Sequence, residues 1–212
     1  MATYIIVAII AYLLGSVSFS VIISKKMAGF DVREKGSGNA GTTNVLRAVG
    51  KKAAIITLVC DILKGVVSVL IAVLAGSIIK DLDKSLLVQL AGIFVIVGHT
   101  FPIFFKFKGG KGIATSLGVI LIINWQIGLI CLVFALLLIA LTRMVSVGSI
   151  AAAVLFPVLV LFINQNYIVL EGSNLGYLIF SIIIAVFVIF NHRENLKRIF
   201  TGTENKISFK KG

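Results

Sequence analysis

The stretch IATSLGVILIINWQIGLICLVFALLLIAL, from Ile113 to Leu141, decides how this chain folds. It is too long for one ordinary membrane helix of about 20 residues and short for two. The polar triplet from Asn124 to Gln126 lies inside it like a turn at a membrane interface. Whether the stretch crosses a bilayer once or twice sets the number and direction of all the other spans.

The composition around this stretch excludes a soluble domain. Apolar residues make up 59% of the 212-residue chain and the mean hydropathy is +1.12, against about 45–50% apolar residues in soluble proteins. The apolar runs are continuous, which disfavours a β-barrel, and 20 Gly with only two Pro suit closely packed helices. Cys60 and Cys131 lie inside apolar runs as small hydrophobes. We therefore expect an all-α, polytopic membrane bundle with no metal site and no cofactor.

Other apolar runs of spanning length are easily found. The first contains no signal-peptide cleavage pattern and is expected to be retained. The clear candidate spans are residues 3–24, 53–79, 86–105, 147–163 and 176–190.

The cations then decide how often residues 113–141 cross, because cytoplasmic loops carry an excess of Lys and Arg. Nearly all of the 20 Lys and Arg lie in residues 25–52, residues 106–111, Arg143 and the tail after residue 192. These segments share one side only if residues 113–141 cross twice. The sequence thus predicts seven transmembrane helices with the N-terminus outside, the C-terminus cytoplasmic, and connections 80–84, 124–126 and 164–174 facing out. The weak point is residues 112–123, which cover only about 18 Å as a helix. Without repeats or a soluble part, residues 1–212 are predicted to be one membrane domain.

The first polar segment expected on the cytoplasmic side reads KGSGNAGTTNVLR, from Lys35 to Arg47. Its glycines permit close backbone approach to a ligand. A helix capped by Thr42 or Thr43 would put Arg47 on the same face as Thr43 and Asn44. The hydrogen-bonding candidates are Ser37, Asn39, Thr42, Thr43 and Asn44. The alternative is a flexible polar linker with a helix cap.

The second segment, residues 98–115, places Lys108 and Lys111 among glycines directly before an apolar helix. Gly109, Gly110 and Gly112 suggest backbone amides aimed at an anion. No strand precedes it and Lys111 is followed by Gly112, so it is not a Walker A loop. The alternative is a basic loop on lipid headgroups.

The third segment follows the last span. On a helix, His192 and Asn195 lie three residues apart on one face, although a solvated juxtamembrane helix is the alternative. Ser146, at the start of the 147–163 span, either donates to a ligand or bonds back to a helix carbonyl. Asp61 and Lys64, inside the second span, should compensate one another or reach the cytoplasmic site, since each is costly alone in hydrocarbon.

These segments contain many cations and hydroxyls but no carboxylate pair and no Ser-His-Asp arrangement. They suit phosphate groups at a membrane surface, and acyl transfer to a phosphorylated alcohol is one chemistry for such a site. An anion channel or transporter for a phosphorylated metabolite is the main alternative, and a lipid-binding scaffold is the third. A channel should carry charge along the whole path, whereas the spans have none beyond their cytoplasmic third.

Together, Gly36 to Asn44 with Arg47, the segment from Gly98 to Thr115, and His192 to Asn195 resemble the bacterial acyl-phosphate:glycerol-3-phosphate acyltransferases. The likeness runs nearly end to end. It implies a seven-span enzyme of the bacterial inner membrane with its active site facing the cytoplasm. The implied reaction moves a fatty acyl group from acyl phosphate to the 1-hydroxyl of glycerol 3-phosphate, giving lysophosphatidic acid and phosphate. An upstream enzyme would supply the acyl phosphate, and membrane lipid but no nucleic acid is an expected partner.

The resemblance also assigns residues. It implies Ser37, Arg47, His192 and Asn195 as catalytic, with Asn39, Thr43 and Ser146 as further substrate-binding candidates. Lys108, Gly109, Gly110, Lys111 and Gly112 match the family's phosphate-binding loop. Glu194 matches a structural residue, and Lys106 stands where a small residue is expected.

The predicted mechanism is direct attack by the substrate hydroxyl on the acyl carbonyl, its proton passing to the donor's phosphate. His99 or His192 as base, and a Ser37 acyl-enzyme, are the alternatives.

Overall fold

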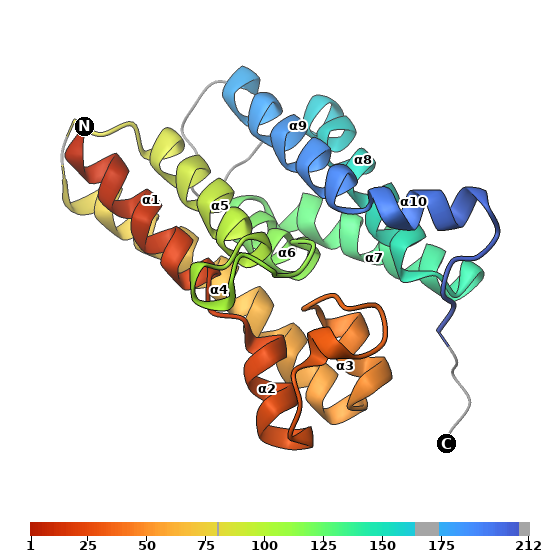
Figure 1. Cartoon of the computed structure of the whole chain (residues 1–212). Coiled ribbons are helices and arrows are strands. Elements are labelled where there is room, and N and C mark those ends of the chain that lie inside the picture. The colour runs from red at the N-terminus through yellow and green to blue at the C-terminus, as the bar shows by residue number, and fades with distance from the viewer. Residues whose placement is uncertain (80, 164–173, 208–212) are drawn as a thin grey trace. The chain divides into compact units, whose positions relative to one another are not determined.

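The computed structural model of the chain describes residues 1–79, 81–163 and 174–207, and in these ranges every regular element is a helix (Figure 1). Two short 3₁₀ turns, η1 Val32–Glu34 and η2 Ile103–Phe105, lie among the α-helices. The α-helices are α1 Ala2–Gly15, α2 Phe19–Ala28, α3 Thr42–Ala48, α4 Lys51–Ile78, α5 Lys84–Thr100, α6 Ile113–Ile123, α7 Trp125–Thr142, α8 Val145–Phe162, α9 Asn174–Asn191 and α10 Arg193–Phe200. The prediction of an all-helical chain is confirmed for this part of the sequence.

Five helical segments are long and apolar enough to cross a membrane, and a bent pair makes a sixth. The five are Ala2–Ala28, Lys51–Ile78, Lys84–Phe105, Trp125–Thr142 and Val145–Phe162. The bent pair joins Leu175–Asn191 to Arg193–Phe200 at an angle of 60°. The remaining apolar helix, α6, has 11 residues and spans roughly 16 Å at about 1.5 Å per residue, well short of a hydrocarbon core of about 30 Å. Lengths alone therefore give five or six spans among the described residues.

The helix break inside Ile113–Leu141 is confirmed. α6 ends at Ile123 and α7 begins at Trp125. The side chain of Asn124 accepts a hydrogen bond from the backbone N–H of Ile127 at 3.1 Å, which is the contact of an N-cap residue. The predicted connection 164–174 lies almost wholly outside the described residues, and so does Lys80.

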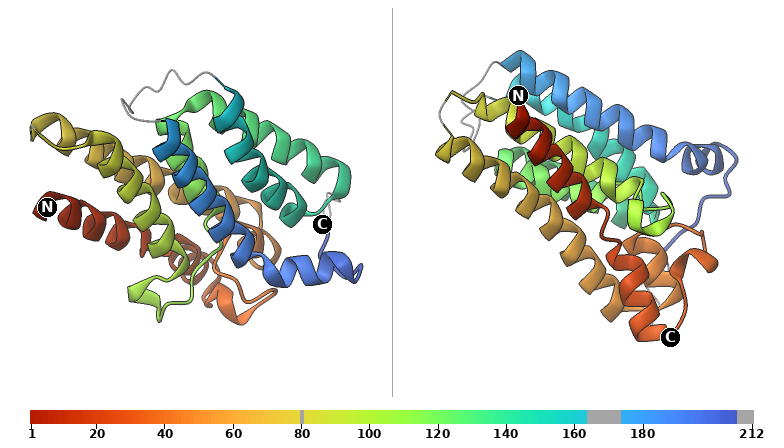
Figure 2. Two further views of the ribbon diagram at one scale, coloured as in Figure 1. Left: turned by 90° about the horizontal axis from the view of Figure 1, so that it is seen from above. Right: turned by 60° about the vertical axis from the view of Figure 1, so that its left-hand side comes forward.

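The chain divides into two compact units, residues 1–123 and the described residues from Asn124 onward. In the first unit α1 packs along α5, and α4 packs against both α5 and α6; Figure 2 shows the same neighbours from two further directions. Glycines allow α4 and α6 to touch backbone to backbone. A Cβ at Gly65 would overlap the carbonyl of Thr115, and one at Gly118 would overlap the carbonyl of Ile62. This is the close packing through small residues that the composition predicted.

The first predicted span, residues 3–24, is interrupted in the structure. α1 ends at Gly15 and α2 begins at Phe19. The Nζ of Lys64, from α4, donates to the carbonyl oxygens of Gly15 and Val17, both at 3.0 Å. The break therefore leaves carbonyls without helical partners, and a buried ammonium from another helix satisfies them.

The second unit is built on α8, which packs against α7 and α9. Its centre is a group of three buried rings, in which Phe156 meets Tyr177 edge-on at 5.8 Å between ring centroids and Phe180 at 6.4 Å. After α10, Gly202 adopts a left-handed φ of 71° and turns the chain back. The N–H of Ile207 then donates to the carbonyl of Arg143 at 2.8 Å. The basic tail and Arg143 thus lie at one end of this unit.

Large aliphatic side chains remain exposed along the spans. On α4 these include Ile55, Leu63, Leu70 and Leu74, and on α7 they include Leu136, Leu137 and Leu141. Apolar surface on this scale is unusual for a protein in water and is what lipid-facing helices present.

Candidate active site

The loop that begins at Lys35 is organised by one buried amide. The Nδ2 of Asn44 donates to the carbonyls of Val32, Lys35 and Asn39, at 2.9, 3.0 and 3.0 Å. Its Oδ1 accepts from the N–H of Ser37 at 2.9 Å. Asn44 is therefore a structural residue that shapes the loop, rather than a side chain offered to a ligand.

Helix α3 starts differently from the prediction. Its N-cap is Gly41, and no side chain makes a capping hydrogen bond. Thr42 and Thr43 belong to the first turn instead, and the hydroxyl of Thr42 is buried without a hydrogen-bond partner among the described residues. Because Thr43 and Arg47 are one turn apart inside α3, they do share a face as expected. Ser37 and Arg47 are exposed, and Asn39 and Thr43 are half-buried.

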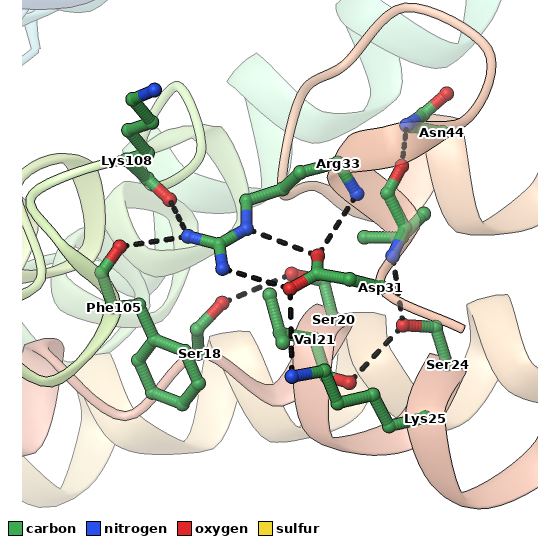
Figure 3. A network of polar contacts seen from close by, with 11 residues as sticks. Ser18, Ser20, Val21, Ser24, Lys25, Asp31, Arg33, Asn44, Phe105 and Lys108 are labelled. Carbon is green, nitrogen blue, oxygen red and sulfur yellow. Dashed lines mark hydrogen bonds and ion pairs between the residues drawn. The ribbon is translucent and has the colours of Figure 1, made fainter. Parts of the chain in front are cut away.

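Arg33 ties this loop to the glycine loop (Figure 3). Its Nη1 donates to the carbonyl of Phe105 at 2.7 Å and to that of Lys108 at 3.3 Å. Its Nε and Nη2 donate to the two carboxylate oxygens of Asp31, at 3.0 and 2.8 Å. The N–H of Ala40 also donates to the carbonyl of Gly109 at 3.4 Å. The first two predicted motifs are thus brought together.

The carboxylate of Asp31 holds the guanidinium in place. Asp31 is buried, and the hydrogen bond from the Arg33 side chain is the largest influence on its pKa. Although burial opposes this effect, the pKa of Asp31 lies below its ordinary value of 3.8. Asp31 is therefore ionised at neutral pH, and its pairing with Arg33 is lost only on strong acidification.

The glycine loop differs from the sequence prediction in how it uses its amides. The N–H of Gly109 donates to the carbonyl of Thr100 and that of Gly110 to the carbonyl of His99, both at 3.1 Å. The prediction that these two amides face an anion is therefore wrong. Both positions need glycine because a Cβ at Gly109 would overlap the His99 carbonyl, and one at Gly110 would overlap the His99 ring. The third glycine, Gly112, has a left-handed φ of 89° directly before α6.

The lysines of this loop lie around that glycine core. Lys108 is exposed and Lys111 is half-buried. Both are therefore able to present a cation near the surface, on a loop whose course is fixed by close packing.

Below the loop lies a buried charged cluster. The Nζ of Lys64 is 3.0 Å from Oδ1 of Asp61, and Nδ1 of His99 is 3.5 Å from the same oxygen. All three side chains are buried. The expectation that Asp61 and Lys64 compensate one another is confirmed, and the cluster reaches the glycine loop through the ring of His99.

In the second unit, Ser146 and Asn195 meet on one carboxylate. The hydroxyl of Ser146 donates to Oε1 of Glu204 at 2.8 Å, and Nδ2 of Asn195 donates to the same oxygen at 2.7 Å. The Nε of Arg198 donates to Oε2 at 2.8 Å. Ser146 does not bond back to its own helix in this arrangement.

His192 sits at the N-cap of α10, directly between α9 and α10. Its Nδ1 is 2.8 Å from the carbonyl oxygen of Val188. Since a carbonyl only accepts, Nδ1 carries a proton, and a neutral His192 has its basic lone pair on Nε2. The side chain is buried, as is that of Asn195 three residues later.

The structure therefore gives two groups of candidate residues, one in each unit, and each group is described by itself. The sequence prediction missed Arg33, Asp31 and Glu204. Asp31 and Arg33 share the Asx-turn spacing, in which the Arg33 N–H donates to Oδ1 of Asp31, and that spacing was a usable signal. Glu204 was visible only as an acidic residue two positions after a glycine in a basic tail.

Relatives of this chain are found over its whole length. The family model described as Glycerol-3-phosphate acyltransferase matches residues 5–202. The glycerol-3-phosphate acyltransferase of Clostridioides difficile (strain 630) is 44% identical over 209 residues, which is 99% of this chain and 98% of that protein. The one of Chlorobaculum tepidum is 38% identical over 233 residues, with the same coverage of 99% and 98%.

Two solved structures resemble this chain over nearly its whole length. The crystal structure of PlsY (YgiH), an integral membrane glycerol 3-phosphate acyltransferase, in its glycerol 3-phosphate form has a TM-score of 0.84 and 36% identity; the match covers 97% of this chain and 96% of that one. The lysophosphatidic acid form has a TM-score of 0.82, with 35% identity and coverage of 97% and 95%. These matches do not favour a channel or transporter.

Several long apolar helices, together with a full-length likeness to an integral membrane enzyme, make this a multi-pass membrane protein. The resemblance seen in its three polar motifs is confirmed: the chain belongs to the glycerol-3-phosphate acyltransferase family.

Proposed function

We propose that this chain transfers a fatty acyl group from acyl phosphate to the 1-hydroxyl of glycerol 3-phosphate, giving lysophosphatidic acid and phosphate. The observation that carries the proposal is the match over 97% of the chain to an integral membrane enzyme solved in a glycerol 3-phosphate form and in a lysophosphatidic acid form. No protein nucleophile is required, because the acyl donor already carries phosphate as a good leaving group.

In residues 1–123 the proposed site residues are Ser37, Arg47, Asn39 and Thr43 with the cations of the glycine loop. Ser37 and Arg47 are exposed on a loop and a helix whose backbone is fixed by Asn44. Lys108 and Lys111 supply positive charge for phosphate groups, and such charge lowers the barrier when it is held before the reaction begins. Gly109, Gly110 and Gly112 remain proposed residues of the phosphate-binding loop, and they also let it pack closely, since a Cβ at each would crowd a neighbouring residue.

In the second unit the proposed residues are His192, Asn195 and Ser146. With Nδ1 held at the Val188 carbonyl, a neutral His192 would act as a general base through Nε2, the role in which imidazole is most often used. His99 is a weaker candidate for a base, since its ring is buried between Asp61 and Gly110.

We also propose an orientation and a place. Both units act as one domain over residues 1–212, which cross the inner membrane of a bacterium seven times, with the N-terminus outside and the active site and C-terminus in the cytoplasm. The basic segments that share an end of each unit support this. An upstream enzyme that makes acyl phosphate supplies the donor, and no nucleic acid is involved.

The proposal is tested with purified protein given acyl phosphate and glycerol 3-phosphate, with lysophosphatidic acid and free phosphate measured together. The two products should form in equal amounts. Ser37→Ala should reduce the rate roughly 10²-fold or more, whereas Glu34→Gln, at an exposed carboxylate three residues earlier, should not. Failure of the wild-type protein to form lysophosphatidic acid would overturn the proposal.

Direct attack and a Ser37 acyl-enzyme are separated by a single turnover with radiolabelled acyl phosphate. Direct attack leaves no label on the protein when glycerol 3-phosphate is withheld. A labelled ester on Ser37 that decays at the rate of turnover on addition of glycerol 3-phosphate would establish the covalent route instead.

A further inference from the structure

The carboxylate of Glu204 lies at the centre of the second unit's polar residues, and neither the sequence motifs nor the proposed mechanism uses it. It is 9% exposed, and Ser146 and Asn195, which donate to it, are 4% and 7% exposed. A carboxylate buried to this extent is retained only when its oxygens are fully hydrogen-bonded. Here they are, by two neutral donors on Oε1 and the Arg198 guanidinium on Oε2.

The chain turns back after α10, and this turn brings Glu204 to Ser146 and Asn195. α10 ends at Phe200, and the N–H groups of Gly202 and Thr203 donate back to the carbonyls of Ile199 and Arg198 at 3.2 and 2.8 Å. The left-handed Gly202 reverses the chain, and Ile207 pairs with Arg143 ahead of α8. The segment from Thr203 to Ile207 thus runs from the end of α10 to the start of α8, with Glu204 between them.

The hydrogen-bond directions at this carboxylate follow from its chemistry. Burial alone would raise the pKa of Glu204, but the hydrogen bonds from Asn195, Ser146 and Arg198 outweigh it and leave the pKa below the ordinary value of 4.5. An ionised carboxylate only accepts. The single hydroxyl hydrogen of Ser146 and one amide hydrogen of Asn195 are therefore committed to Glu204.

We propose that Glu204 is a positioning residue for acyl transfer: it fixes Ser146 and Asn195 and takes the hydroxyl hydrogen of Ser146, so that Ser146 meets a substrate as an acceptor. An oxygen with only lone pairs to offer repels the oxygens of phosphate and binds a hydroxyl. Ser146 therefore recognises a glycerol hydroxyl of glycerol 3-phosphate and not its phosphate group. This inference rests on the proposed function. It adds Glu204 as a positioning residue, and it assigns recognition of a glycerol hydroxyl, and not of the phosphate group, to Ser146.

The first test is Glu204→Gln, which keeps the shape of the side chain. The glutamine amide accepts hydrogen bonds through its oxygen and donates through its NH2 group. Either Arg198 or the pair of Ser146 and Asn195 would therefore face a donor. We expect kcat/KM for glycerol 3-phosphate to fall roughly 10- to 100-fold, as for the loss of a charge-assisted contact. The KM for acyl phosphate should change less than about twofold, since the change is confined to recognition of the alcohol.

A matched control separates positioning from simple attachment of the tail. Arg198→Gln removes the cation from Oε2 and leaves the two contacts on Oε1 in place. It should lower the thermal midpoint of unfolding while kcat/KM for glycerol 3-phosphate stays within about threefold of wild type. If Arg198→Gln reproduced the kinetic loss of Glu204→Gln, Glu204 would serve only to hold the tail, and the inference would be wrong.

Ser146→Ala tests the acceptor role and leaves Asn195 and Arg198 as donors to Glu204. It should raise the KM for glycerol 3-phosphate and leave unchanged the inhibition constant of inorganic phosphate, used as a competing product. Combined with Glu204→Gln it should cost little more than Glu204→Gln alone, because the contribution of Ser146 depends on its contact with Glu204. A weaker phosphate inhibition in Ser146→Ala, or fully additive losses, would overturn the inference. Wild-type turnover is measured in the same series, so a failure of the proposed reaction itself is seen separately.

Discussion

At the scale of single residues, Arg33 joins the two loops that bear the proposed phosphate-binding groups. Its guanidinium bonds two carbonyls of one loop and the Asp31 carboxylate of the other at the same time. Only a planar side chain with several donors can do this. The backbone of Lys108 is therefore held in place by a side chain of the neighbouring loop.

Arg33→Lys should accordingly impair the enzyme although it keeps the charge. A lysine can pair with Asp31 but cannot also reach the carbonyls of Phe105 and Lys108. We expect about 1–3 kcal/mol of lost stability and a rise in the KM for glycerol 3-phosphate of about tenfold, measured by thermal unfolding and initial rates. Lys25→Gln is the control, since Lys25 is exposed and 3.7 Å from the same carboxylate, and such pairs contribute at most about 1 kcal/mol. Equal losses in both variants would mean that positive charge near Asp31, and not the several donors of the planar guanidinium, accounts for the effect of Arg33.

Lys106 is a residue whose backbone conformation conflicts with its side chain. It has a left-handed φ of 58°, and Phe107 follows at 56°. A non-glycine residue is disfavoured there by about 1–2 kcal/mol. Lys106 therefore makes the loop less stable than a glycine would at the same position.

Lys106→Gly should therefore stabilise the protein by about 1 kcal/mol or slightly less, once the greater freedom of glycine in the unfolded chain is included. The measurement is the thermal midpoint in detergent. Lys106→Ala removes the same charge and keeps the backbone conflict, so it should give no gain. A similar gain from alanine would trace the effect to charge.

At the scale of helices, the two breaks in the spans show what a sequence can reveal about this fold. The break at Asn124 was predictable because its cause is local: a polar residue with a capping side chain between two apolar runs. The break between α1 and α2 was not, because the group that stabilises it, Lys64, comes from a helix far along the chain. In the same way Lys108 and Lys111 were found from their spacing, whereas Arg33 and Glu204 act through contacts that only folding creates.

The cluster of Asp61, Lys64 and His99 should accordingly be important for stability. In Lys64→Met the Asp61 carboxylate would keep only His99 as a neighbouring partner. The carbonyls of Gly15 and Val17 would lose their donor. Breaking one side of a buried ion pair costs about 3–5 kcal/mol, and for a chain of this size that lowers the thermal midpoint by roughly 10 °C.

The double variant Asp61→Leu with Lys64→Met distinguishes the ion pair from the helix break. Removing both charges should recover a large part of the loss, because no charge is left unpaired in the interior. No recovery at all would show that the carbonyl contacts of Lys64, and not its pairing with Asp61, account for its effect.

At the scale of the whole molecule, the distribution of charge sets how the chain sits in the membrane. α4 has 28 residues and is therefore about 42 Å long at about 1.5 Å per residue, enough to cross a bilayer. The basic segment 25–52 leads into its first turn, and the loop containing Asp81 and Asp83 follows it. The positive-inside rule therefore predicts that the first lies in the cytoplasm and the second outside.

Accessibility of single cysteines tests this orientation directly. The starting protein has Cys60 and Cys131 replaced by serine and alanine, since these are the chain's two cysteines. Lys26→Cys and Asp81→Cys are then made at exposed positions and treated with a membrane-impermeant maleimide in intact cells. Asp81→Cys should react before the cells are opened, and Lys26→Cys only afterwards. Labelling in the opposite order would reverse the molecule in the membrane and place the proposed phosphate-binding loops outside, away from any acyl phosphate made in the cytoplasm.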